Sequence, residues 1–431
     1  MSWADGTGET LDYVRAFRCL GAECEDNCCR GWEVNVDQAH HDRWAACFAA
    51  GSEERTIFER SVRLNPEPTG RRFARVSLED DGTCPFLEAD GLCVIHRRHG
   101  QALLSETCAA YPRVVSRHQA TVEMAGALSC PEMVRACFSD AYCGKVVAFS
   151  SDELPTGALP PAVRTLPELP ADPYERHFDA VRQTMSAILR GPGISLTSRL
   201  LQLLEYTHRI AVFYHRDCAE PGPRLALERQ RSIARPPASS SERGGGAEPL
   251  GVMVVQALLT LRLHRFPEEP FAEIVREVLA GYAGEVASLG PADAAGVDFP
   301  PATLAAAFAN RRARIEPRFG RRIEHYLGRY LENCLHREWF IAIPDPYTFT
   351  HLVAVRVAVL RFLLYSQPSV AAMAEERPAD AFDELEHVAV RVTYRFCRAF
   401  DHDLGFQEAI YRALAEQDLL RFELAPDLLQ F

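Results

Sequence analysis

The sequence predicts a mainly α-helical protein with a small, irregular, cysteine-rich module that contains short β-hairpins. Two observations lead to this fold class. From about residue 150 onward, apolar residues recur with the period of amphipathic helices, whereas nine of the fourteen cysteines lie within the first 130 residues. We expect the module to cover residues 10–145 and the α-helical domain to cover residues 150–431, because a chain of 431 residues has room for two domains.

Short strands and turns are expected in the cysteine-rich module. Gly31–Asp37 (GWEVNVD) alternates as a strand does, and Phe73–Leu78 predicts a second strand. The run GTCPFLEADGLCVIH that follows predicts a hairpin, with turns at Asp81-Gly82 and Asp90-Gly91. Such a region has few long helices with which to bury a core, so a bound metal would contribute directly to its folding free energy.

The rest of the chain predicts helices that end at turn residues. Asp172-Pro173 has the N-cap and first-position residues of a helix, and Gly191-Pro192-Gly193 ends that helix. A second helix is expected from about residue 196. Residues 235–248 (RPPASSSERGGGAE) have the composition of a flexible linker. Further helices are expected at about 250–264, 270–288, 301–313, 320–338, 347–366, 380–400 and 404–417.

Composition narrows the functional class. The net charge of −12 argues against a nucleic-acid partner, which would require a basic surface. The longest apolar stretches, Leu250–Leu261 and Leu352–Tyr365, fall short of the ~18–20 residues that a membrane helix needs. The N-terminus has no secretory signal pattern. We therefore expect a cytoplasmic protein with no membrane partner, in which cysteines serve metal ligation or catalysis rather than disulfides.

Eight of the nine N-terminal cysteines are the candidate metal ligands. They are Cys19, Cys24, Cys28, Cys29, Cys84, Cys93, Cys108 and Cys130. Thiolates suit zinc and iron–sulfur clusters, and the spacing favours neither metal over the other. One loop supplies the first four cysteines, the others would close the site from distant segments, and eight thiols would also fill two four-coordinate sites. The remaining cysteines (Cys47, Cys137, Cys143, Cys218, Cys334 and Cys397) are expected to be small core residues.

Several side chains near the cysteines have two alternative interpretations each. His96 is either a further ligand or a hydrogen-bonding surface residue at a hairpin end. Arg113 either holds a carboxylate or phosphate or pairs with an acidic residue near the cysteines. Asp26 and Asn27 either bond to the sulfur atoms or cap a helix. Farther along, the arginines between 311 and 329 are expected to form a solvated helix face, and Glu324, Tyr326, His336, Glu338 and Trp339 either line a pocket or lie in the core.

The order of these motifs resembles a known family. C-x4-C-x3-C-C-x-G-W (Cys19–Trp32), C-P-F-L (Cys84–Leu87), C-x-I-H (Cys93–His96), C-x-x-Y-P-R (Cys108–Arg113) and S-C-P (Ser129–Pro131) are similar to a CxxCxxCC-type iron- or zinc-chelating domain. More closely, the chain resembles the flagellin lysine-N-methylase (FliB-type) family, also over Ile323–Phe340. The resemblance implies an iron–sulfur cluster, [4Fe–4S] rather than zinc, and methyl transfer from S-adenosylmethionine to lysine ε-amines of flagellin.

The residues themselves supply no signature for binding that methyl donor. We find no glycine-rich strand-to-helix turn, and Gly31 occupies the third position of a radical S-adenosylmethionine spacing. No catalytic or cofactor-binding residue is identified from the sequence. Three functions therefore stay open: a lysine-N-methylase acting on a flagellin-like protein, an iron–sulfur oxidoreductase or hydroxylase acting on a small amino-acid-like metabolite, and a noncatalytic metal-binding or redox-sensing protein.

Overall fold

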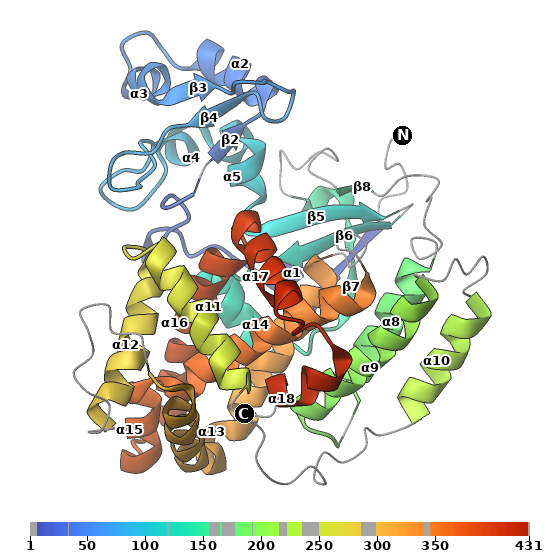
Figure 1. Ribbon diagram of the computed structural model, residues 1–431. Helices are drawn as coiled ribbons and strands as arrows, with labels where there is room; N and C mark the ends of the chain where they lie inside the picture. Colours follow the sequence, from blue (N-terminus) through green and yellow to red (C-terminus); the bar gives the residue numbers. More distant parts are fainter. Residues whose placement is uncertain are drawn as a thin grey trace. The chain divides into compact units, whose positions relative to one another are not determined.

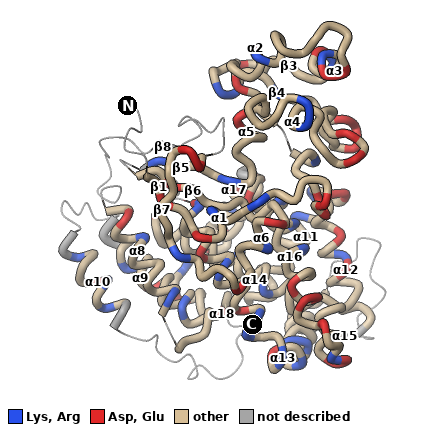
Figure 2. The backbone as a smooth tube through the Cα atoms, turned by 180° about the vertical axis from the view of Figure 1, so that it is seen from behind, with Lys and Arg blue, Asp and Glu red and all other residues tan. Residues whose placement is uncertain are grey.

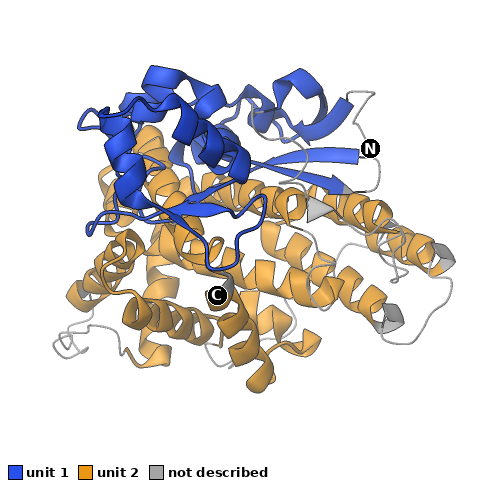
Figure 3. Cartoon of the chain, turned by 90° about the horizontal axis from the view of Figure 1, so that it is seen from above, with its two compact units in different colours: residues 1–168 blue, residues 169–431 orange. Residues whose placement is uncertain are grey.

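The chain forms two compact units, residues 1–168 and 169–431, which are shown in different colours in Figure 3. The computed structural model (Figure 1) describes residues 7–32, 34–118, 121–154, 164–165, 177–191, 193–214, 222–234, 250–285, 299–338 and 345–429. The predicted linker at 235–248 and the predicted helix start at Asp172 lie outside the described residues. Acidic and basic residues are interspersed along the backbone of both units (Figure 2).

The first unit contains a five-stranded mixed sheet that the sequence did not predict. Its strands are β1 (Thr7–Leu11), β5 (Arg113–His118), β6 (Thr121–Gly126), β7 (Val146–Ser150) and β8 (Arg164–Thr165), in the order β7-β1-β6-β5-β8. Helices α1 (Asp12–Ala16) and α6 (Pro131–Phe138) contact each other in the same unit. Strand β1 pairs in parallel with β6, more than a hundred residues away, so no local sequence pattern marks the pairing.

A second, three-stranded antiparallel sheet in this unit confirms two predicted strands. Its order is β2-β4-β3, and β2 (Val34–Val36) and β4 (Ala74–Val76) lie within the predicted Gly31–Asp37 and Phe73–Leu78, whereas β3 (Val62–Leu64) was not predicted. Helices α2 (Gln38–Cys47), α3 (Glu53–Ser61), α4 (Val94–His99) and α5 (Glu106–Ala110) accompany it. Trp44 lies at the centre of the core and donates from its indole N–H to the Leu103 carbonyl at 2.7 Å.

The second unit is helical, which confirms the mainly α prediction. Its helices are α8 (Phe178–Leu189), α9 (Leu196–Tyr214), α10 (Gly222–Ala234), α11 (Leu250–Arg265), α12 (Pro270–Glu285), α13 (Pro301–Arg337), α14 (Pro346–Ser366), α15 (Pro368–Glu376), α16 (Ala381–Phe400), α17 (Leu404–Glu416) and α18 (Ala425–Leu429). Helix α14 contacts α9, α13 and α16, so segments distant in sequence pack on one central helix (Figure 1).

Helix α13 corrects one prediction. Separate helices were expected at 301–313 and 320–338, but one helix runs through Pro317. Proline lacks the N–H for an intrahelical hydrogen bond and usually breaks a helix. Here Ile315 and Phe319, on either side of it, are fully buried, and α13 packs on α14. Tertiary packing therefore outweighs the local cost of the proline.

Helix α14 is the core helix of the second unit. Among the described residues it is the one helix long and apolar enough to cross a membrane by length and composition, and nearly all of its side chains are buried. Arg356 is buried in this helix, and its carboxylate partners explain how the charge is tolerated there. The Arg356 guanidinium donates to the Glu338 carboxylate at 2.8 and 2.7 Å and to Asp401 at 3.1 Å, and Arg337 donates to Asp401 at 2.9 Å. Two cations and two anions thus form a balanced buried network.

Candidate metal centre

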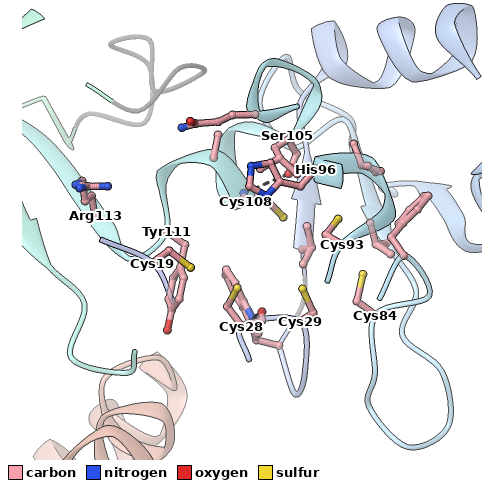
Figure 4. A pocket seen from close by; sticks show the side chains of 18 of the residues that line it. Cys19, Cys28, Cys29, Cys84, Cys93, His96, Ser105, Cys108, Tyr111 and Arg113 are labelled. Carbon is pink, nitrogen blue, oxygen red and sulfur yellow. Dashed lines mark hydrogen bonds between the residues drawn. The ribbon is translucent and has the colours of Figure 1, made fainter. Parts of the chain in front are cut away.

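One cavity in the first unit brings most of the predicted ligands together. Its volume is about 310 Å³, and Figure 4 shows the side chains around it. Six of the eight cysteines line it: Cys19, Cys28, Cys29, Cys84, Cys93 and Cys108. Cys24 and Cys130 do not. The cavity wall also includes Trp32, Tyr111 and Arg113, which stand in the cysteine motifs, and Phe17 and Arg18, which the sequence did not mark.

Backbone hydrogen bonds hold three cysteine-bearing segments side by side. The Cys84 N–H donates to the Cys29 carbonyl at 2.8 Å, and the Val94 N–H donates to the Phe86 carbonyl at 2.9 Å. The predicted hairpin around Leu87 and Cys93 is reduced to one isolated bridge. Its predicted turns do form, since Gly82 and Gly91 have the positive φ that favours glycine. These contacts place Cys29, Cys84 and Cys93 around one space.

Cys108 enters the cavity from a helix. It belongs to α5, which Ser105 caps by accepting a hydrogen bond from the Cys108 N–H at 3.4 Å. Of the other four predicted ligands, Cys19 and Cys28 also line the cavity, whereas Cys24 and Cys130 lie elsewhere in the unit. Cys19 and Cys28 are exposed, Cys24 donates to the Asp26 carbonyl at 3.1 Å, and Cys130 is buried at the start of α6. In this loop the Asn27 side chain accepts from the Cys29 N–H at 3.0 Å, which stabilises a turn and does not cap a helix.

Burial keeps the innermost thiols protonated. It raises the pKa values of Cys84, Cys108 and Cys130 to about 12 each and also raises the pKa of Cys93. A hydrogen bond with Cys28, together with burial, raises the pKa of Cys29 above its usual range. A metal ion would therefore have to displace a proton from each thiol that it binds.

The donor chemistry fits a soft metal, although the side chains are not arranged around a single point. None of the described cysteines forms a disulfide, and six of them border one cavity. Within the described ranges, no three Cys, His, Asp or Glu side chains are placed so that they could together hold a metal ion. The thiols share a cavity but, in this conformation, no common coordination point. That the eight cysteines bind metal stays a prediction.

His96 and two aromatic rings complete the wall of the cavity. The sequence placed His96 at a hairpin end, whereas the structure places it in helix α4, exposed and lining the cavity. The Trp32 and Tyr111 rings have centroids 5.3 Å apart, and the Trp32 indole donates to the Cys28 carbonyl at 2.6 Å. The Tyr111 hydroxyl is 3.1 Å from the Ser129 hydroxyl. An aromatic surface thus lies directly beside the cysteines.

Arg113, for which two readings were open, borders the same cavity. Its guanidinium donates to the Phe17 carbonyl at 3.1 Å and lies 5.1 Å from the centroid of the Phe17 ring. Burial and the nearby Arg18 lower the pKa of Arg113. In the part of the chain that the structure describes, Arg113 forms no ion pair with a carboxylate. The structure therefore does not support the hypothesis that Arg113 pairs with an acidic residue near the cysteines.

The candidates in the second unit have structural roles. Glu338 belongs to the Arg356 network, Tyr326 is buried, and burial lowers the pKa of His336 to about 3. Trp339 lies outside the described residues. The expected solvated arginine face is wrong in part, because Arg311 is fully buried with its guanidinium 4.0 Å from the centroid of the Tyr282 ring. Cys334 and Cys397 are buried, as expected of core residues, whereas Cys47 and Cys143 are exposed.

Comparisons with known proteins agree with the resemblance found in the motifs. Over 129 residues, 30% of this chain, the sequence is 29% identical to the flagellar biosynthetic protein FliU of Salmonella muenchen, and the match spans 75% of that protein. It is also 29% identical over 129 residues to lysine-N-methylases of Salmonella typhimurium and Salmonella choleraesuis. The match spans 31% of each of these two relatives. No family profile matches the chain, and no solved structure matches it.

Proposed function

We propose that this chain is a cytoplasmic methyltransferase of the lysine-N-methylase type, which carries a thiolate-bound iron–sulfur cluster and methylates the ε-amine of a lysine in flagellin or a similar protein. The observation that carries the proposal is the cavity in which six cysteines and two arginines meet beside the Trp32 and Tyr111 rings. The similarity to proteins named lysine-N-methylase supports the reaction class. S-adenosylmethionine is the methyl donor that the family resemblance implies.

The cluster ligands would come from the eight cysteines. Cys29, Cys84, Cys93 and Cys108 are the best placed, because all four line the cavity and none of them is exposed. A [4Fe–4S] cluster would supply a redox-active iron centre there, and zinc is the alternative metal. The other four cysteines would either bind metal at a second site or lie beside the first site without binding its metal; they are Cys19, Cys24, Cys28 and Cys130. The irregular module would then gain part of its stability from the metal.

The chain's own residues would have to bind and orient two substrates and accept a proton. A lysine amine is nucleophilic only when neutral, so the site must remove its proton and hold it in line with the donor's methyl group. His96 and Tyr111 line the cavity, and a neutral imidazole or a phenolate accepts a proton. The rings of Trp32 and Tyr111 would exclude water from one side of the bound substrates.

A cavity next to the thiols favours an enzyme over a noncatalytic metal protein. A purely structural metal site is closed and fully coordinated, whereas this one borders a space whose volume is typical of small-molecule sites. The same cavity would also serve an iron–sulfur oxidoreductase or hydroxylase acting on a small amino-acid-like metabolite. These two enzyme classes differ in whether a methyl group is transferred to protein.

The test begins with anaerobic purification, followed by iron, sulfide and zinc analysis. We expect iron and acid-labile sulfide; stoichiometric zinc without sulfide would contradict the iron–sulfur cluster. The loaded protein is then incubated with methyl-labelled S-adenosylmethionine and flagellin, and we expect label on flagellin lysines. Lys145 is the only lysine of this chain, so self-labelling adds little background. An intact cluster without methyl transfer would favour the metabolite enzyme.

A further inference from the structure

Two arginines at the edge of the cavity are held side by side by one carbonyl group. The Arg18 guanidinium donates to the Phe17 carbonyl oxygen at 2.8 Å, and the Arg113 guanidinium donates to the same oxygen at 3.1 Å. Arg18 also donates to the carbonyls of Arg15 and Ala16, which orients its side chain. The Phe17 ring supports the Arg113 guanidinium from one face. Both side chains line the cavity.

Arg18 and Arg113 lack the acidic partner that other arginines of the unit have. Arg15 pairs with Glu153, Arg98 with Glu54, and Arg135 with Glu25. Neither Arg18 nor Arg113 pairs with an acidic side chain anywhere in the described ranges, although the chain has 59 acidic and 47 basic residues. The Nε atom of Arg113 is buried with no hydrogen-bond partner. Two adjacent cations and an unused buried donor leave a place for an anion.

We infer that Arg18 and Arg113 form a carboxylate-binding subsite, and that the carboxylate belongs to the amino-acid part of the methyl donor. The inference rests on the proposed function, because the donor is known only from the resemblance. The planar guanidinium fork of Arg113 suits a carboxylate, and the nearby Trp32–Tyr111 pair offers an aromatic surface to the nucleoside. A free amino-acid-like metabolite would present the same α-carboxylate without a nucleoside.

A binding experiment separates these possibilities. Calorimetry measures the dissociation constants of S-adenosylhomocysteine and of 5′-methylthioadenosine, which keeps the nucleoside but lacks the amino-acid carboxylate. We expect the wild-type chain to bind S-adenosylhomocysteine roughly 10- to 100-fold more tightly, as loss of a charge-assisted contact predicts. Arg113→Gln should weaken the binding of S-adenosylhomocysteine by a similar factor and leave the affinity for 5′-methylthioadenosine unchanged.

Two further variants keep the result interpretable. Arg18→Gln alters an exposed side chain, so it tests the subsite even where Arg113→Gln misfolds. This variant should also weaken the binding of S-adenosylhomocysteine and leave the affinity for 5′-methylthioadenosine unchanged. Arg75→Gln removes an exposed arginine of β4 that does not line the cavity, and neither affinity should change. Iron and zinc content is measured in every sample. This measurement separates a carboxylate subsite from a pair of arginines that balances the charge of a metal–thiolate centre.

Each other outcome overturns a specific claim. Equal wild-type affinities for the two nucleosides would overturn the carboxylate subsite and leave the proposed methyl donor intact. Arginine variants that change metal content, but do not discriminate between the nucleosides, would assign the pair to the metal centre and also overturn the subsite. Binding of neither nucleoside would overturn the proposed donor and the subsite together. Tight binding of free L-methionine without either nucleoside would assign the subsite to an amino-acid-like metabolite and overturn the donor assignment.

Discussion

Replacing Arg356 by methionine tests the buried charge network of the second unit. Arg356 makes three hydrogen bonds to two carboxylates, and the Asp401 side chain is only 2% exposed. Without it, Arg337 is left as the one cation for two anions, at 2.9 Å from Asp401 and 3.9 Å from Glu338. Breaking a buried pair in this way costs about 3–5 kcal/mol. We therefore expect the free energy of unfolding to fall by about 4 kcal/mol.

Thermal unfolding measures this loss. For a unit of this size, about 4 kcal/mol corresponds to a fall in Tm of roughly 8–15 °C. The matched control is Arg412→Met, since Arg412 pairs with Glu408 on the exposed side of α17, and its loss should cost less than about 1 kcal/mol. Combining Arg356→Met with Glu338→Gln should restore part of the stability, because one cation then faces one anion. An Arg356→Met variant no less stable than Arg412→Met would refute the reasoning.

Three further predictions concern the thiols, a buried histidine and a tight glycine contact. Cys84→Ala should lower the metal bound per chain, whereas Cys47→Ala, exposed and outside the cavity, should leave it unchanged; equal metal content would count against the site. Burial lowers the pKa of His351 to about 4, so as pH falls from 7 to 5 the unfolded chain gains a proton that the folded chain does not. The free energy of unfolding should then fall by about 2 kcal/mol less in His351→Gln than in the wild type, as measured by urea titration at both pH values. Gly8→Ala would place a methyl group 2.5 Å from the Phe149 ring and should cost about 1–3 kcal/mol, whereas Gly70→Ala meets nothing within 4 Å and should be neutral; equal urea midpoints would contradict this.

Local patterns in the sequence predicted the helices well. Helices α11, α14, α16 and α17 begin and end within two residues of their predicted bounds, because each is a long run with many apolar residues bounded by turn or capping residues. The same reasoning failed at Pro317, where the packing of Ile315 and Phe319 outweighs a local rule. It also missed the five-stranded sheet, in which β1 pairs with β6 and β7 across more than a hundred residues of chain.

The sequence predicted the chemistry of the site better than its shape. The cysteines were marked by spacing, and six of them line one cavity. The spacing gave no means to tell Cys24 and Cys130 from the rest, because which thiols share a space depends on backbone contacts such as that between Cys84 and Cys29. No motif in the sequence marked Arg18 as a candidate residue. Its place beside Arg113 results from a carbonyl shared across 96 residues of chain.

The central position of α14 has a consequence for synthesis on the ribosome. Helices α9 and α13 bury their apolar faces against α14, and α14 in turn needs α16 and α18 to cover it. Until α14 (Pro346–Ser366) has emerged, α9 and α13 lack the partner for those faces, and α14 itself is covered only when α16 and α18 follow. The core of the second unit is therefore completed only late in translation, and the apolar faces of its earlier helices stay exposed until then.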